Sequence, residues 1–233
     1  FVRPLTYCIY VFLVLLVATT SINAQRHYYI SYSVNEGLAQ SQVRDIYQSN
    51  DGHLWVATVG GVSKFDGNTF QTFNKSNGLL NNLANLVYEG NDGRVYAACQ
   101  GGLVAIEKRN TSTFKFPEPF NEILVFDAIS DESINILATN GKGILYHKEG
   151  QPETTLDLGG VDQNFVRCIE GSTSEYLAGT KNGLFEIAGD RQVKIINDSL
   201  SVNAIVYDGS TYWIATNGDG IYTYRKGDLE LFS

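Results

Sequence analysis

The chain has 233 residues, and 43% of them are hydrophobic, which is enough for a substantial core and excludes an intrinsically disordered protein. Its formal net charge is −8, and this acidic balance argues against a nucleic acid partner, because phosphates are bound by basic surfaces. It also leaves no basic stripe for an anionic membrane surface. The 23 glycines, 14 tyrosines and 12 phenylalanines, beside only four prolines, favour short strands joined by tight turns.

Residues 1–24 have the layout of a secretory signal peptide. Arg3 supplies a positive charge, an unbroken apolar run follows at 7–18, and small residues lead to Ala24, where we expect cleavage. The apolar run is too short for a membrane-spanning helix, which needs about 20 residues. We therefore expect residues 25–233 to be periplasmic or otherwise extracytoplasmic. Retention of the leader as an uncleaved anchor is the alternative.

One short pattern recurs five times along the rest of the chain. A bulky residue is followed two positions later by alanine, then by a polar turn, and then by a glycine that precedes Val, Leu or Ile. The first residues of the pattern are Trp55, Tyr96, Ile136, Tyr176 and Trp213, and the turn glycines are Gly61, Gly102, Gly143, Gly183 and Gly220. Five matches at a spacing of about 40 residues predict an all-β fold, a β-propeller of four-stranded antiparallel blades.

The first repeat resolves into four strands separated by turn residues. We expect these strands at 43–48, 53–58, 62–65 and 69–73. Asp51-Gly52 and Asp66-Gly67 lie in two of the turns and predict type I′ geometry, in which both central residues have positive φ. The blades are expected at about 43–73, 83–116, 123–158, 165–196 and 202–232, all within a propeller domain at 25–233, with 28–32 as an N-terminal closing strand.

Core roles are expected for the tryptophans and for the cysteines beyond the leader. Trp55 and Trp213 lie on second strands, where an aromatic ring fills the space between neighbouring sheets. Cys99 and Cys168 lie in apolar strand sequences without a nearby histidine or a second cysteine. They are expected to be small buried hydrophobic residues rather than a disulfide or a metal site.

Three segments of the first repeat carry a recognisable sequence. They are the Gly-Leu linker at 37–38, the Asn-Asp-Gly-His-Leu-Trp sequence at 50–55 and the Gly-Val-Ser-Lys-Phe-Asp-Gly sequence at 61–67, and a second Gly-Leu linker follows at 78–79. Together they resemble the two-component regulator propeller repeat of extracytoplasmic sensor regions in bacterial histidine kinases and hybrid two-component proteins, notably in Bacteroidetes. The resemblance weakens in the third and fourth repeats, which lack the Asp-Gly turn and the tryptophan.

The resemblance implies a sensor that is longer than this chain. Such rings usually have seven blades, so we expect the five blades to be a fragment; a five-bladed ring closed by packing of the first blade on the fifth is the alternative. In intact relatives, binding would pass through downstream modules of the same protein and a membrane helix to a cytoplasmic kinase. The parent protein is then expected in the inner membrane, with phosphorelay activity outside this chain.

The sequence offers little for catalysis. The three histidines, His27, His53 and His147, are isolated, and no nucleophile, zinc or phosphate-binding motif is present. We therefore expect no catalytic residue, no metal and no cofactor in this chain. A secreted propeller enzyme, such as a lyase or a glycosidase, and a propeller interaction module remain the alternatives.

Binding is expected at the turns between the second and third strands of each blade, which we name B–C turns. In a propeller these turns meet the D–A connections, which run from the fourth strand of one blade to the first strand of the next. The polar residues expected to face a shared cavity there are Gln100, Asn140, Lys142, Lys181, Asn182, Asn217 and Asp219. Their hydrogen-bonding groups suit a polar small molecule or an oligosaccharide.

Overall fold

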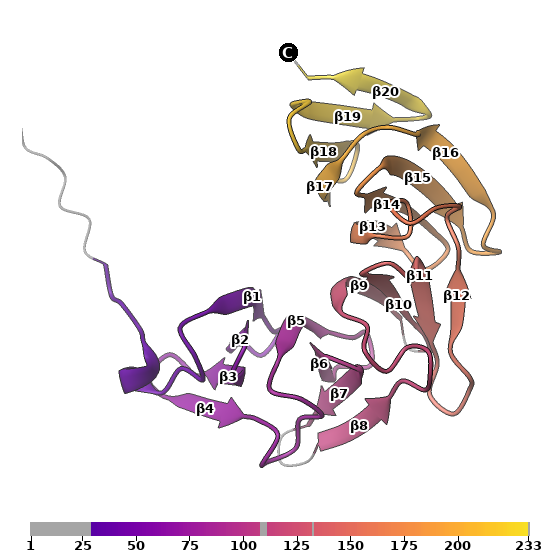
Figure 1. Ribbon diagram of the computed structural model, residues 1–233. Helices are drawn as coiled ribbons and strands as arrows, with labels where there is room; N and C mark the ends of the chain where they lie inside the picture. Colours follow the sequence, from indigo (N-terminus) through magenta and orange to yellow (C-terminus); the bar gives the residue numbers. More distant parts are fainter. Residues whose placement is uncertain (1–28, 108–110, 132, 233) are drawn as a thin grey trace, which may run out of the picture. The chain divides into compact units, whose positions relative to one another are not determined.

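The computed structural model describes residues 29–107, 111–131 and 133–232, so the expected leader at 1–24 lies outside the described residues. From Tyr32 onward the chain forms one compact unit. Its strands make five antiparallel sheets of four strands each, and within each sheet the spatial order of the strands follows the chain (Figure 1). This arrangement confirms the predicted all-β fold of four-stranded blades.

A short 3-10 helix, η2 (Val34–Glu36), precedes the five sheets. The first sheet contains β1 (Val43–Gln48), β2 (Leu54–Thr58), β3 (Gly61–Phe65) and β4 (Phe70–Phe73), and the second contains β5 (Ala84–Glu89), β6 (Val95–Cys99), β7 (Gly102–Ile106) and β8 (Thr111–Lys115). The third contains β9 (Val125–Ser130), β10 (Asn135–Thr139), β11 (Ile144–His147) and β12 (Thr154–Leu156). The fourth contains β13 (Val166–Ser172), β14 (Glu175–Thr180), β15 (Gly183–Ala188) and β16 (Val193–Asn197), and the fifth contains β17 (Val202–Tyr207), β18 (Tyr212–Thr216), β19 (Ile221–Arg225) and β20 (Asp228–Leu231). In the first sheet, every strand boundary lies within one residue of its predicted position.

Each sheet packs against the next one along the chain. The first strands of consecutive sheets contact each other, β1 with β5, β5 with β9, β9 with β13 and β13 with β17. Four apolar clusters fill the spaces between neighbouring sheets. Leu103 and Leu145, for example, are fully buried between the second and third sheets. Burial of such apolar surface is the main favourable term in folding, so the sheets stabilise one another in series.

The repeated glycine begins or immediately precedes the third strand for a steric reason. Gly61 has a φ of +137°, and a Cβ atom there would collide with the backbone oxygen of Phe73 on β4. Gly102 meets the backbone oxygen of Phe114 in the same way. In the first and second sheets the fourth strand therefore approaches the third so closely that only glycine fits.

The predicted type I′ turns at the Asp-Gly pairs are wrong. Gly52 has a φ of +86°, but among the described non-glycine residues only Arg191 and Lys226 have positive φ. Gly52 N donates to Ser49 O at 2.8 Å, which closes a four-residue turn. Asp51 contributes its side chain instead, since Oδ1 accepts from Ser49 Oγ at 2.5 Å. The Asp51 carboxylate accepts a hydrogen bond within the turn, so Asp51 keeps a negative φ and only Gly52 takes the left-handed conformation.

Residues 29–32, the described part of the expected closing strand at 28–32, belong to no strand, and each of the five described sheets already has four strands of its own. The side chain of Tyr32 packs on aromatic rings of the first sheet. The ring of Tyr32 lies 4.9 Å from that of Phe65 and 5.7 Å from that of Phe70, measured between centroids. Directly afterwards, Glu36 Oε2 accepts from Ser33 N at 2.6 Å in a capping box that starts η2.

The expected core roles are confirmed for Trp55 and for both cysteines. Trp55 is buried and stacks on Phe73 with centroids 5.9 Å apart. Cys99 and Cys168 are free and buried, and burial raises the pKa of Cys99 to about 11 and that of Cys168 to about 12. Trp213 is only half-buried and lies against the edge of Phe232.

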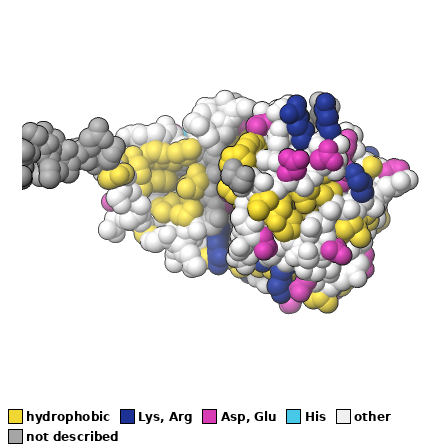
Figure 2. All heavy atoms as spheres, turned by 90° about the horizontal axis from the view of Figure 1, so that it is seen from above, with side chains coloured by type: hydrophobic (Ala, Val, Ile, Leu, Met, Phe, Trp, Pro, Cys, Tyr) yellow, Lys and Arg dark blue, Asp and Glu magenta, His cyan; other side chains and the backbone are white. Residues whose placement is uncertain are grey.

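Hydrophobic side chains remain exposed on the first and fifth sheets. Ile46 on β1 is 60% exposed, and Val206 on β17 and Leu231 on β20 are 60% and 57% exposed. Figure 2 shows apolar side chains in patches among acidic and basic ones on the displayed face.

Alanine substitutions at two glycines test the close approach of the third and fourth strands. We expect Gly61→Ala to lower the free energy of unfolding by roughly 2–3 kcal/mol, because it adds a backbone collision to the strain of positive φ. Gly67→Ala is the matched control, since its φ is +97° but no atom lies within 4 Å of the added Cβ. It should cost about 1 kcal/mol. Equal losses in urea denaturation would contradict this account.

Candidate functional site

The B–C turns and the D–A connections lie at the same end of every sheet, which we name the mouth end. In all five sheets a backbone N–H just after the second strand donates to a carbonyl just before the first strand. The donor and acceptor pairs are Val59 and Gln42, Gln100 and Leu83, Asn140 and Leu124, Lys181 and Phe165, and Asn217 and Ser201, with N to O distances of 3.3, 3.1, 3.1, 3.0 and 2.7 Å. All seven residues predicted to bind ligand lie in these turns.

Four of the seven predicted side chains hold the mouth end together. Oδ1 of Asn140 accepts from Leu124 N at 2.7 Å, and Nδ2 of Asn182 donates to Asp198 O at 3.2 Å. Oε1 of Gln100 accepts from an asparagine side chain of the preceding connection, and Nζ of Lys181 lies 2.8 Å from Asp162 Oδ1. These contacts anchor turns to connections, a structural role that the sequence did not reveal.

The other three predicted side chains, those of Lys142, Asn217 and Asp219, make no hydrogen bond or ion pair with any residue that the structure describes. Their backbones are fixed nevertheless. Thr139 Oγ1 accepts from Lys142 N, and Thr216 Oγ1 accepts from Asp219 N, both at 3.1 Å. A fixed backbone that carries an unpaired polar side chain suits ligand binding.

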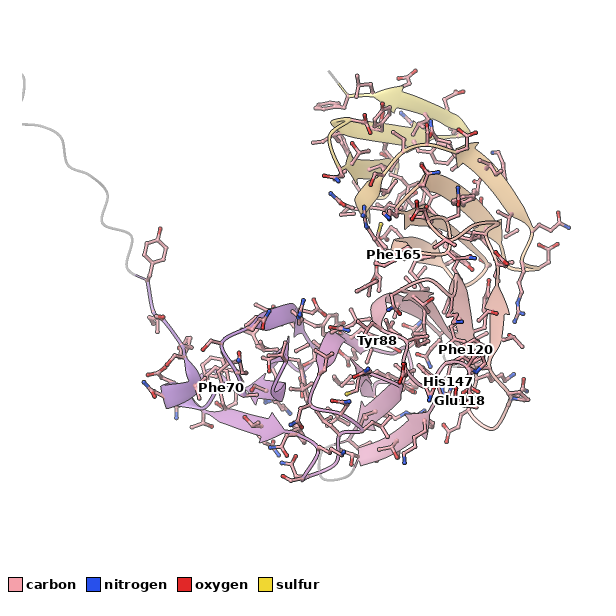
Figure 3. All side chains as sticks on the ribbon, viewed as in Figure 1. Phe70, Tyr88, Glu118, Phe120, His147 and Phe165 are labelled. Atoms are coloured by element: carbon pink, nitrogen blue, oxygen red, sulfur yellow. The ribbon has the colours of Figure 1, made fainter. Side chains whose placement is uncertain are left out.

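A cavity of about 490 Å³ opens at the mouth end of the third sheet. Its lining residues are Glu118, Pro119, Asn121, Glu122, Ile123, Asn140 and Lys142. Two of the predicted residues, Asn140 and Lys142, line this cavity. Two carboxylates of the D–A connection, those of Glu118 and Glu122, also line it, and sequence reasoning missed them. Glu118 accepts from Asn121 Nδ2, and Figure 3 shows Glu118 and Phe120 on this connection. Carboxylate, amide and ammonium groups together can bind several hydroxyl groups.

A β-bulge interrupts the first strand of every sheet at its mouth end. The pairing of β1 with β2 skips Arg44, because Val43 faces Thr58 and Asp45 faces Ala57. The residues skipped in the five sheets are Arg44, Asn85, Phe126, Arg167 and Asn203. A bulge re-aims a side chain and leaves the extra residue unpaired in the ladder.

Four of these bulge residues, together with Phe165, line a second cavity of about 360 Å³, which we name the bulge pocket. The rings of Phe126 and Phe165 are 5.5 Å apart between centroids. Figure 3 shows Phe165 beside the first strands of the third and fourth sheets. Sequence reasoning missed this pocket, although the spacing of 41 residues from Arg44 to Asn85, Phe126 and Arg167 was the available signal.

The residues after two of the bulges connect neighbouring sheets. Asp45 Oδ2 accepts from Val87 N on β5, and Asp127 Oδ2 accepts from Ile169 N on β13, both at 2.9 Å. Burial raises the pKa of Asp127 to about 6, although the two backbone N–H groups that it accepts from oppose the shift. The same cause raises the pKa of Asp45.

The two described histidines are not at the mouth end. His53 precedes β2 and lies 2.8 Å from Asp51 Oδ2, whereas His147 ends β11 and lies 3.2 Å from Glu153 Oε1. β2 runs toward a B–C turn and β11 runs away from one, so both histidines lie at the end of their sheet that is farther from the mouth end. Within the described residues, no group of three or more His, Cys, Asp or Glu side chains is placed to hold a metal ion.

Five four-stranded sheets packed in series through their first strands define a β-propeller. Residues 37–60 match the family described as Two component regulator propeller, which confirms the resemblance of the first repeat. Histidine kinase P4 of Formosa agariphila is 41% identical over 58 residues, which are 24% of this chain and 4% of that protein.

Solved structures show the same fold. The extracellular domains of two putative hybrid two component systems from B. thetaiotaomicron superpose with TM-scores of 0.68 and 0.65 at 19% and 20% identity, over 82% of this chain and 28% of each of theirs. An inactive virginiamycin B lyase from Staphylococcus aureus superposes with a TM-score of 0.61 at 15% identity, over 82% of this chain and 66% of the lyase. At these identities the likeness is one of fold alone. The chain thus spans a small part of the signalling proteins that it matches.

The raised pKa of Asp127 predicts a pH-dependent stability. Between about pH 4 and pH 6 the folded protein holds a proton on Asp127 that the unfolded chain has released. The contribution of this group to the free energy of unfolding therefore increases as the pH falls through about 6. We expect Asp127→Asn to remove this gain, so that the difference in Tm between wild type and variant changes from pH 7 to pH 4.5. A constant difference across that range would contradict the assignment.

Proposed function

We propose that this chain is a ligand-sensing propeller from the extracytoplasmic part of a two-component signal-transduction protein. The observation that carries the proposal is the family match at 37–60, which covers the linker, β1 and β2 of the first sheet. The 41% identity with a histidine kinase over 58 residues also supports it. Signalling by the parent protein would require downstream modules of that protein, a membrane helix and a kinase.

The mouth end is the proposed ligand site. Its cavity presents Lys142 from a B–C turn together with Glu118 and Glu122 from a D–A connection. A polar lining of this kind suits a polar small molecule or an oligosaccharide, whose hydroxyl groups need both donors and acceptors. The propeller enzyme remains the alternative, but the described histidines lie away from this cavity and the lyase shares only the fold.

The extracytoplasmic location rests on the leader sequence at 1–24 and on the extracellular domains that the chain resembles. Among the described residues there is no helix long and apolar enough to cross a membrane. We expect a fusion of alkaline phosphatase to the C-terminus of this chain to be active in intact bacteria, because that enzyme needs an oxidising compartment for its disulfides. Deletion of 7–18 from the same fusion is the control and should abolish activity. An inactive full-length fusion that is expressed at normal level would contradict this location.

Ligand binding is testable by thermal shift. We expect one or more neutral or acidic oligosaccharides from a polysaccharide panel to raise the Tm of the chain, because a ligand that binds only the folded state stabilises it. Lys142→Gln should weaken that binding about ten-fold, the effect of losing one charged hydrogen bond. Lys148→Gln, which removes the same charge from an exposed position after β11, is the matched control. A panel without any shift would overturn the oligosaccharide class, and equal effects of the two variants would overturn the mouth cavity.

A further inference from the structure

The bulge pocket has a charge opposite to that of the whole chain. The formal net charge is −8, yet two of the five lining residues are arginines and none is acidic. Asp45 and Asp127 follow bulge residues directly, but their carboxylates accept N–H groups of the neighbouring sheet and do not line the pocket. The lining of the pocket is thus basic on an acidic protein, and its two arginines can attract an anion.

The two arginines differ in how they are held. Nη1 of Arg167 donates to Ser201 Oγ at 3.0 Å, to Val202 O at 3.2 Å and to Asn203 Oδ1 at 3.0 Å, so its position is fixed by the fifth sheet. Arg44 makes no hydrogen bond or ion pair with any residue that the structure describes. A guanidinium with its donors unused is free to bind an oxyanion in two parallel hydrogen bonds.

A third donor points to a ligand as well. Nδ2 of Asn85 is buried and has no acceptor among the described residues. A buried amide without an acceptor costs free energy, and an oxygen atom in the pocket would remove that cost. Asn85 lies at the bulge of the second sheet, between Arg44 of the first and Phe126 of the third.

The apolar part of the pocket is the aromatic pair Phe126 and Phe165, tilted by 34° to each other. Aromatic faces bind the apolar faces of rings, and the volume of about 360 Å³ is within the range of roughly 300–1,000 Å³ usual for small ligands. The pocket therefore combines cationic donors, an amide donor and an aromatic surface. That combination suits a ring compound that carries an oxyanion.

We propose that the bulge pocket binds the anionic group of an acidic saccharide, a carboxylate or a sulfate, with Arg44, Asn85 and Arg167 as donors and Phe126 and Phe165 against the sugar ring. The proposal rests on the proposed sensing function and names its ligand class. Lys181 N donates to Phe165 O, so one pocket residue is attached directly to a B–C turn. The bulges lie at the mouth end of the first strands, so the bulge pocket and the mouth cavity are at the same end of the sheets.

The probes are trigalacturonic acid, its fully methyl-esterified form and sodium sulfate, each titrated into the full chain and into two variants. Trigalacturonic acid is expected to raise the Tm and to bind at least ten-fold more tightly than the methyl ester, and sulfate is expected to compete with it. Arg44→Gln should weaken binding of trigalacturonic acid at least ten-fold. Arg225→Gln, the same charge change at an exposed position on β19, should leave it unchanged.

Three results would overturn the proposal. They are binding of the acid no tighter than that of its ester, equal loss in the two arginine variants, and no binding of either anion up to 10 times the concentration that saturates a neutral panel ligand. If one of these results is obtained and a neutral oligosaccharide still binds in a way that Lys142→Gln weakens, the proposal of an anion pocket is wrong and the sensing function stands. If no saccharide of the panel and neither anion binds, both proposals are wrong.

Discussion

The bulge at the mouth end of each first strand is the constraint on which the bulge pocket and several contacts between neighbouring sheets depend. One extra residue there breaks the alternation of side chains, so that residues such as Arg44 and Arg167 are re-aimed, while Asp45 and Asp127 reach the backbone of the next sheet. In a regular strand, consecutive side chains point to opposite faces of the sheet. The residue that lines the pocket and the aspartate that binds the next sheet would then lie on opposite faces. The same irregularity therefore connects the sheets and lines the pocket between them.

Charged side chains between the sheets affect stability differently according to their burial and their hydrogen bonds. Apolar clusters between sheets carry the stability, and the acidic surface charge is compatible with solubility without contributing to the fold. Where Asp127 must enter the space between sheets, burial raises its pKa, so a charged group there reduces stability at neutral pH. Arginines at the bulges avoid that cost because Arg44 is exposed and Arg167 is satisfied by three acceptors.

The sequence was sufficient to predict what repeats. The recurring bulky residue, alanine and glycine placed the first four strands within one residue, and at Gly61, Gly102 and Gly143 the glycine reports the close approach of the fourth strand. The Asp-Gly turns were mispredicted because composition does not distinguish a turn with two left-handed residues from one in which the Asp side chain accepts and only glycine is left-handed. The bulges were missed because their signal is a spacing of 41 residues from Arg44 to Asn85, Phe126 and Arg167 without a common residue type.

Comparison of the five repeats within this one chain separates the two kinds of position. Gly61 and Gly102 are the same residue type because a fourth strand excludes any Cβ at both places. The bulge position holds Arg, Asn, Phe, Arg and Asn in turn, although the backbone irregularity is the same in every sheet. The fold thus fixes where the side chain points and leaves its chemistry open. A propeller can therefore change the chemistry of the bulge pocket at the four bulge positions that line it without changing the packing of its sheets. The B–C turns leave less freedom, because four of their seven predicted polar side chains already hold the structure together.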